Sequence, residues 1–155
     1  VLLVGAGGAA AGVLGPLLVA GARHITVANR TLAKAQALVQ SHSVLAALQK
    51  AELSAQDPLA LSAYFDVIIN ATASSLSGGG IPVPASVLRP GALAYDMMYG
   101  PAAQGFLDWA RQHGAVPRDG LGMLVEQAAE AFLLWRGVRP PSAQVLREMQ
   151  QSATA

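Results

Sequence analysis

The chain opens with a short apolar run, Val1–Val4, that leads directly into the glycine-rich segment Gly5–Gly12. A strand-like run followed by Gly-x-Gly and then by a helix-forming stretch is typical of the first unit of a dinucleotide-binding fold. The first glycine, Gly5, permits a tight turn, and Gly7 lets the backbone approach a pyrophosphate. The N-terminus of the following helix then offers unpaired N–H groups to that anion. The third glycine of the usual spacing is Ala10, which the pattern tolerates, and a glycine-rich turn without a ligand is the alternative.

Apolar runs alternate with helical patterns along the whole chain, which predicts βαβ units and a parallel sheet buried on both faces. We therefore expect one α/β domain over residues 1–155, a doubly wound, three-layered sheet of about six strands in the order 3-2-1-4-5-6. The predicted strands are Val1–Val4, His24–Ala28, Ser43–Leu48, Asp66–Asn70, Ala92–Asp96 and Ala115–Arg118. The predicted helices are Gly8–Ala20, Thr31–Gln40, Ala102–His113, Leu121–Arg136 and Ala143–Gln151, and Ala73–Pro84 is predicted to be a binding loop.

The composition excludes several classes of function. The net charge is +1 and charged residues make up 12% of the chain, so neither a nucleic-acid surface nor a polybasic membrane anchor is indicated. The absence of cysteine excludes disulfides and thiolate chemistry, and no metal site is expected. The uncharged segment Val1–Ala22 is long enough to span a bilayer, but its glycines and Pro16 favour a strand, a turn and a helix instead.

The segment after the second predicted strand indicates which dinucleotide is bound. NAD-binding domains place Asp or Glu there, roughly 20 residues past the glycines, to bind the ribose 2′-hydroxyl. This chain has Asn29, Arg30 and Thr31 instead, and its first acidic residue is Glu52. Arg30 and Lys34 can bind a 2′-phosphate, which predicts NADP(H) as the cofactor. The alternative is that the two cations form a solvated pair on a helix surface.

Five segments together resemble the C-terminal NADP-binding domain of shikimate dehydrogenases. The resemblance covers essentially the whole chain, although the first two segments are also shared with other NADP-linked enzymes, such as glutamyl-tRNA reductases. The segments are GAGGA (Gly5–Ala9), NRTLAK (Asn29–Lys34), INAT (Ile69–Thr72), YDMMY (Tyr95–Tyr99) and DGLGMLVEQAAEAF (Asp119–Phe132).

The resemblance implies a cytoplasmic enzyme of aromatic amino-acid biosynthesis that reversibly reduces 3-dehydroshikimate to shikimate with NADPH. It also implies roles for residues that match the family motifs. The pyrophosphate would contact Gly5, Ala6, Gly7, Gly8 and Ala9, and the 2′-phosphate would contact Asn29, Arg30, Thr31 and Lys34. Thr72 would line the cofactor cleft, and the nicotinamide would lie against Met97 and the Gly120 backbone. The substrate would contact Tyr99 and Gln127.

Some of these roles also follow from the residues themselves. Met97 and Tyr99 follow the carboxyl end of the fifth predicted strand, the edge at which open α/β sheets bind ligands. Gln127 lies on a predicted helix that is otherwise rich in apolar residues, where a buried amide needs a hydrogen-bonding partner. The alternative for Gln127 is an amide on the helix surface.

No residue of this chain is predicted to be catalytic. Hydride transfer to a ketone requires an acid that protonates the developing alkoxide. In the family this role belongs to a Lys–Asp pair in an N-terminal substrate domain, which this chain does not include. His24, His42, His113, Asp96 and Asp119 are the candidates here, and none is assigned. We interpret Asp96 as a structural residue that holds the end of its strand, and Asp119 as belonging to the N-cap region of the longest helix.

The chain starts on a predicted core strand without an initiator methionine, so we expect a domain of a longer two-domain protein. Such a fragment is expected to bind NADP(H) without catalysing the reaction. The alternatives are an isolated nucleotide-binding or regulatory module, or a relative that acts on quinate.

Overall fold

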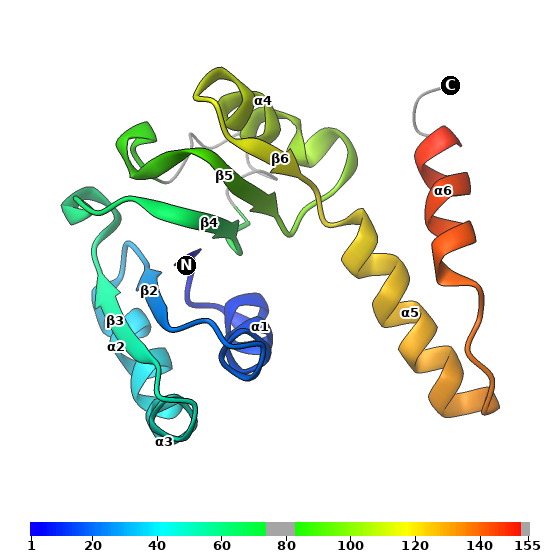
Figure 1. Cartoon of the computed structure of the whole chain (residues 1–155), viewed down its shortest axis with the longest axis horizontal. Helices are drawn as coiled ribbons and strands as arrows, with labels where there is room; N and C mark the ends of the chain where they lie inside the picture. The colour runs from blue at the N-terminus through cyan, green and yellow to red at the C-terminus, as the bar shows by residue number, and fades with distance from the viewer. Residues whose placement is uncertain (74–82, 153–155) are drawn as a thin grey trace.

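The computed structural model describes residues 1–73 and 83–152, and a single parallel sheet lies at its centre (Figure 1). In this part of the chain six strands pair in the order β3-β2-β1-β4-β5-β6, which confirms the predicted doubly wound topology. The strands are β1 (Leu2–Val4), β2 (His24–Ala28), β3 (Glu52–Gln56), β4 (Phe65–Asn70), β5 (Leu88–Asp96) and β6 (Val116–Arg118).

Helices connect most of these strands, and the five predicted helices are present within one or two residues of their predicted bounds. The helices are α1 (Gly8–Val19), α2 (Leu32–Ser41), α3 (Ser43–Leu48), α4 (Gln104–Gln112), α5 (Leu121–Arg136) and α6 (Ser142–Ser152). Short 3-10 turns add η1 (Pro58–Ala60), η3 (Ala85–Val87) and η4 (Gly100–Ala103). The predicted loop Ala73–Pro84 lies largely outside the described residues.

The prediction of a strand at Ser43–Leu48 is wrong. This segment is helix α3, which follows α2 after His42, and the third strand is Glu52–Gln56. Alanine and leucine dominate the segment and favour a helix, whose Ala46 packs into the core on the α1 side. Lys50, with φ of 54°, then turns the chain into β3.

The fifth strand starts at Leu88, four residues before the predicted Ala92. Pro90 and Gly91 suggested a break, but the strand passes through them with a shift in its pairing to β4 between Phe65 and Val67. Gly91 adopts a φ of 76° at this irregularity, a conformation that glycine adopts without strain.

Two apolar clusters, one on each face of the sheet, form the core, so the predicted three layers are confirmed. Neighbouring β1 residues alternate between the clusters, since Leu3 belongs to one and Leu2 and Val4 to the other. The cluster that contains Leu3 is covered by buried residues of α1, α2 and α3: Ala10, Leu14, Leu18, Ala35, Leu38 and Ala46. The second is covered by Ala103 of η4 and by Phe106, Leu107 and Ala110 of α4.

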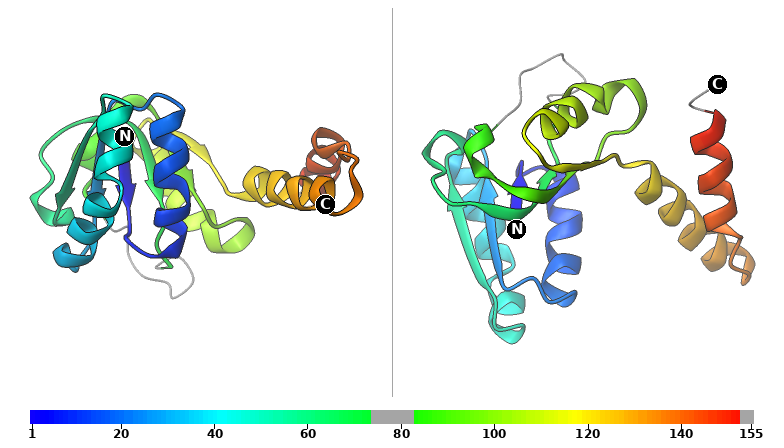
Figure 2. Two further views of the ribbon diagram at one scale, coloured as in Figure 1. Left: turned by 90° about the horizontal axis from the view of Figure 1, so that it is seen from below. Right: turned by 45° about the horizontal axis from the view of Figure 1, so that its top comes forward.

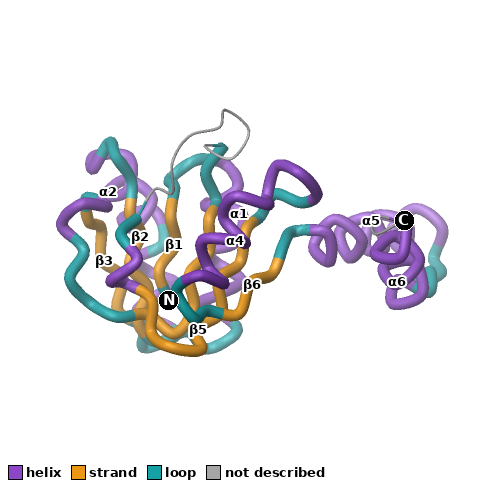
Figure 3. The backbone as a smooth tube through the Cα atoms, turned by 90° about the horizontal axis from the view of Figure 1, so that it is seen from above, coloured by secondary structure: helices purple, strands orange, loops and turns teal. Residues whose placement is uncertain are grey.

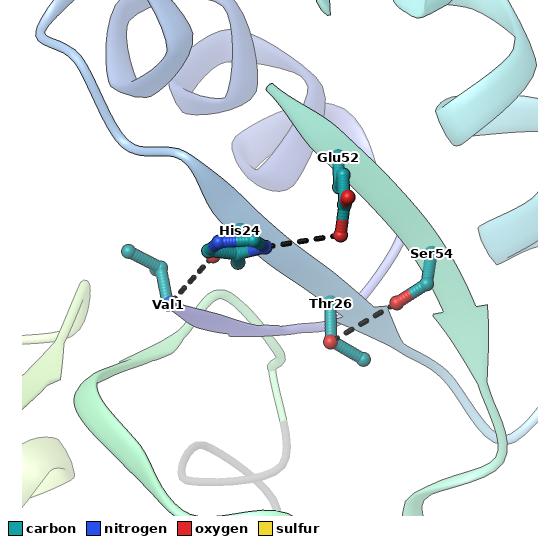
Figure 4. A network of polar contacts seen from close by, with 5 residues as sticks. All are labelled: Val1, His24, Thr26, Glu52 and Ser54. Carbon is teal, nitrogen blue, oxygen red and sulfur yellow. Dashed lines mark hydrogen bonds and ion pairs between the residues drawn. The ribbon is translucent and has the colours of Figure 1, made fainter. Parts of the chain in front are cut away.

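The second face is uncovered over β2 and β3, because only the short turn η1 and its flanking loops connect β3 to β4. Polar side chains occupy this part of the sheet (Figure 4). His24 Nδ1 lies 3.1 Å from Glu52 Oε2, and the hydroxyls of Thr26 and Ser54 are 3.1 Å apart. In β3, the polar residues therefore lie on the exposed face, and Leu53 and Ala55 lie on the face that packs against the core.

Helix α5 leaves the end of β6 and runs away from the sheet, and α6 packs back along it as a helical arm (Figures 1, 2 and 3). Gly137, with φ of 69°, ends α5, and Arg139 in the following turn donates hydrogen bonds to Glu126 and Glu130. Leu134 and Trp135 of this arm remain largely exposed.

Among the residues that the structure describes, no helix is both long enough and apolar enough to cross a membrane. The uncharged segment Val1–Ala22 instead contains β1, the glycine-rich turn and α1, as expected.

Candidate functional site

The carboxyl ends of the strands bring distant parts of the sequence to one edge of the sheet. Val4 of β1 is in register with Ala28 of β2 and Asn70 of β4, Ala28 with Gln56 of β3, and Asn70 with Asp96 of β5. Most of the predicted site residues follow this row by one to three positions along the chain. The strand order reverses between β1 and β4, and open α/β sheets bind ligands outside the carboxyl ends at such a point.

The fold itself requires glycine at position 5. Gly5 has a φ of 110°, and its N–H donates to the Ala28 carbonyl over 2.8 Å. A Cβ at this position would lie 2.9 Å from the Ala71 carbonyl oxygen on the neighbouring strand end. Gly5 therefore serves both the tight turn and the close approach of the β1 and β4 ends.

The fold does not require glycine at positions 7 and 8. Both are exposed, neither has a positive φ, and a Cβ on either would meet no atom within 4 Å. Gly7 is the N-cap of α1 without a side-chain cap, and the first turn of α1 contains no acidic residue. Because the first N–H groups of a helix lack intrahelical partners, an anion can bind in the open space in front of these glycines.

The β2–α2 turn and the first turn of α2 carry two cations, Arg30 and Lys34. Arg30 and Lys34 are exposed, and neither forms an ion pair within the described parts of the chain. Thr31 is the N-cap of α2, but its hydroxyl makes no capping hydrogen bond. The Asn29 backbone N–H donates to Gln56 over 3.2 Å, and its side-chain amide donates to the Thr31 carbonyl over 2.9 Å. The turn is thus held by Asn29 and leaves its cationic groups available.

The ends of β4 and β5 are joined by a buried polar network. Asn70 is 1% exposed and Asp96 is 0% exposed. The Asn70 amide donates to Asp96 Oδ2 over 3.2 Å, while Asp96 Oδ1 accepts the Met98 N–H over 2.9 Å. Asn70 Oδ1 accepts the Thr72 hydroxyl over 2.7 Å and the Thr72 N–H over 3.2 Å. This geometry agrees with the structural role predicted for Asp96.

Gly120, between β6 and α5, lies directly against the segment that follows β5. Its N–H donates to the Met98 carbonyl over 2.8 Å, and a Cβ would lie only 2.2 Å from the Met97 carbonyl oxygen. Only glycine allows this contact. The structure therefore brings Met97 and Gly120 together, as their predicted common role requires. Tyr99, two residues after Met97, is 46% exposed.

Comparison with known proteins decides the family. A model of the shikimate / quinate 5-dehydrogenase family matches residues 1–77, and a model of the shikimate 5′-dehydrogenase C-terminal domain matches residues 120–150. A shikimate dehydrogenase (NADP(+)) of Verminephrobacter eiseniae is 80% identical over 153 residues, which are 99% of this chain and 53% of that protein. The chain belongs to the shikimate dehydrogenase family. It spans about half the length of the curated relatives it matches.

Solved structures of the shikimate dehydrogenase family share this fold. The shikimate 5-dehydrogenase of Thermus thermophilus, in complex with NADP(H) and shikimate, has a TM-score of 0.77 at 30% identity. This chain is covered to 98% and that chain to 54%. The quinate dehydrogenase of Corynebacterium glutamicum, in complex with NAD, has a TM-score of 0.81 at 28% identity, with coverages of 97% and 54%.

Two further family-motif residues lie where β5 and β6 meet α5. Burial, together with the carboxylate of Asp119, raises the pKa of Tyr95 above its usual value, while a backbone contact at Met123 opposes this effect. Asp119 Oδ1 also accepts the Leu121 N–H over 3.3 Å, in agreement with its predicted place in the N-cap region of α5.

Gln127 lies on the exposed side of α5, between the exposed residues Glu126 and Ala128. No apolar pocket of the described residues surrounds its amide. In this chain it matches the alternative of a helix-surface amide, and its contact with a substrate stays a prediction.

The histidines lie away from this edge. His24 starts β2 at the opposite edge of the sheet. His42 and His113 are the C-caps of α2 and α4, and their Nδ1 atoms lie 3.1 Å and 2.8 Å from the Leu38 and Trp109 carbonyl oxygens. That none of the histidines is catalytic stays a prediction.

Proposed function

We propose that this chain binds NADP(H) and forms the cofactor-binding part of a shikimate dehydrogenase, which reversibly reduces 3-dehydroshikimate to shikimate with NADPH. One observation carries the proposal. The open α1 N-terminus at Gly7 and Gly8 lies at the same sheet edge as Arg30 and Lys34, which form no ion pair with any residue that the structure describes. This arrangement suits a ligand with one phosphate group at the strand switch point and another near the end of β2.

The parts of the cofactor fit different groups along the edge. The pyrophosphate would bind the backbone of the turn from Gly5 to Ala9. The planar guanidinium of Arg30 suits bidentate binding of the 2′-phosphate, with Lys34 as a second cation and the Thr31 hydroxyl as a donor. The nicotinamide, which carries the hydride, would lie toward Met97 and Gly120, near Thr72.

The relatives support this cofactor and this reaction. The curated relatives are named NADP(+)-dependent shikimate dehydrogenases, and one similar structure contains NADP(H) and shikimate. A second candidate is quinate oxidation with NAD, because the similar quinate dehydrogenase binds NAD. The cations after β2 favour the NADP-dependent function, since NAD-binding domains place a carboxylate there.

The substrate would be bound between this chain and a second domain. Tyr99 and Gln127 would contact it from this side, and the catalytic Lys–Asp pair would come from the other. The arm formed by α5 and α6 exposes apolar side chains that a second domain could bury: Phe132, Leu134, Trp135, Val138, Val145 and Met149.

Replacing Arg30 with alanine tests the assignment of the 2′-phosphate site. A charge-assisted hydrogen bond contributes on the order of 1.5–3 kcal/mol, so Arg30→Ala should weaken NADPH binding roughly tenfold to a hundredfold. NADH binding should stay nearly unchanged, because NADH has no 2′-phosphate. Fluorescence titration of the purified chain with each cofactor measures both dissociation constants.

Arg89→Ala is the matched control, since Arg89 is also exposed and pairs with Asp66 at the opposite edge of the sheet. This variant should bind both cofactors as the unmodified chain does. Equal weakening of NADPH and NADH by Arg30→Ala would show that Arg30 supports the turn instead of binding the phosphate.

A further inference from the structure

We propose that the buried pair Asn70–Asp96 is a positioning pair for the nicotinamide half of the cofactor site. The inference rests on the proposed NADP(H) function and extends it to two residues that need not touch the cofactor. The pair joins the ends of β4 and β5, and the groups that it orders are Thr72 on one side and Met97, Met98 and Gly120 on the other.

Asp96 holds the segment that follows β5. Its two carboxylate oxygens accept different N–H groups, one from the Asn70 side chain and one from the Met98 backbone. The Met97 N–H donates in turn to the Asn70 carbonyl over 3.0 Å. Met97 is therefore held in place, because its neighbours Asp96 and Met98 are hydrogen-bonded as well. A carboxylate suits this place because both of its oxygens accept hydrogen bonds. The side-chain amide of an asparagine would place its own N–H donor against one of the two N–H donors, from Asn70 or Met98.

The same segment fixes the start of α5. The Met98 carbonyl accepts the Gly120 N–H over 2.8 Å, and the Met97 backbone packs against the Gly120 α-carbon so closely that no side chain fits there. A displacement of Met97 and Met98 must therefore move Gly120 as well. Both predicted nicotinamide contacts depend on where Asp96 holds this segment.

Asn70 orders the turn on the other side of the pair. Its Oδ1 atom accepts both the hydroxyl and the N–H of Thr72, while its amide nitrogen donates to Asp96. The 2′-phosphate residues are anchored separately, because the Asn29 N–H bonds to Gln56 at the end of β3. Disturbing the pair should thus affect the nicotinamide end of the cofactor and spare the 2′-phosphate end.

The polarity of the pair allows a direct test by exchange. In Asp96→Asn, an amide nitrogen must face either the Asn70 amide or the Met98 N–H. In Asn70→Asp, two buried carboxylates face each other. In the double variant Asn70→Asp/Asp96→Asn, residue 96 donates to residue 70 and still accepts from Met98, while residue 70 still accepts from Thr72. The exchange thus keeps all of these hydrogen bonds and reverses only one.

The experiment measures two ligands on the full chain. NADPH binding is followed by nicotinamide fluorescence, and adenosine 2′,5′-bisphosphate, which lacks the nicotinamide, is titrated by calorimetry. Each single variant should weaken NADPH binding about tenfold or more and change adenosine 2′,5′-bisphosphate binding less than about twofold. The double variant should restore NADPH binding to within about threefold of the original. Asp66→Asn, an exposed carboxylate at the opposite edge, is the matched control and should change neither ligand.

Three results would overturn the inference: unchanged NADPH binding in both single variants, equal loss of both ligands, or no recovery in the double variant. Equal loss would mean that the pair supports only the fold. If the unmodified chain bound neither ligand, the proposed function itself would fail, which is a different result from a failure confined to the variants.

Discussion

Gly120→Ala should lower the free energy of unfolding by about 3 kcal/mol and abolish detectable NADPH binding. The added Cβ would lie 2.2 Å from the carbonyl oxygen and 2.7 Å from the carbonyl carbon of Met97. Both are backbone atoms, so no side-chain rotation can relieve the overlap, and the β6–α5 junction must move away from the end of β5. Urea denaturation gives the change in stability, and NADPH titration gives the loss of binding.

Gly8→Ala is the matched control for stability. A Cβ on Gly8 would meet no atom within 4 Å, and alanine is favoured over glycine in a helix by roughly 0.5–1 kcal/mol. The control should keep or raise the stability and still weaken NADPH binding, because it fills the space proposed for the pyrophosphate. Equal stability losses in the two variants would contradict the assignment of Gly120 as a close contact and Gly8 as an open position.

The chain on its own should bind NADPH but oxidise shikimate with NADP at no measurable rate. Lys34 and Lys50 are its lysines, and neither forms an ion pair with an aspartate in the described residues. Asp96 is buried and both of its carboxylate oxygens accept hydrogen bonds, so it is poorly placed to protonate a substrate. Correct orientation of the reactants accounts for roughly 7–11 kcal/mol of a barrier, and an open cleft with contacts from one side provides little of it.

The assay pairs NADPH fluorescence titration with a shikimate oxidation assay on the same preparation, and a full-length family member serves as the positive control. Binding without turnover is the expected result. Turnover that is abolished by replacing one of the histidines or Asp96 would show that this chain carries its own catalytic group, contrary to the assignment made here.

The fold could be predicted from the sequence where the hydrophobic periodicity and the turn-forming residues indicated the same boundaries. The glycine-rich turn after β1 fixed the topology, and the apolar runs of β2 and β4 marked neighbouring core strands. The third strand could not be placed, because Glu52–Gln56 is a half-exposed edge strand without β-branched residues, whereas Ser43–Leu48 is more apolar. An edge strand on an uncovered face has a weaker hydrophobic signal than a core helix of the same length.

The sequence allows a prediction of the site only where the residue type indicates what it binds, and these site residues stay predictions. Arg30 and the missing carboxylate could be recognised from the sequence alone. Asn70 was not singled out, although a polar residue ending the apolar run DVIIN was a signal that could have found it. The contact between Gly120 and Met97 depends on how two strand ends meet in space, so the sequence did not predict it, and the family resemblance implied only a common role for the two residues at the nicotinamide.

Titration of the purified chain with NADPH and with NADH tests the central claim most directly. In the described part of the chain, Arg30 and Lys34 form no ion pair after the end of β2, where an NAD-specific domain would carry a carboxylate. One charge-assisted contact to the 2′-phosphate should make the dissociation constant for NADPH at least about tenfold lower than that for NADH. Equal dissociation constants, or tighter binding of NADH, would contradict the account.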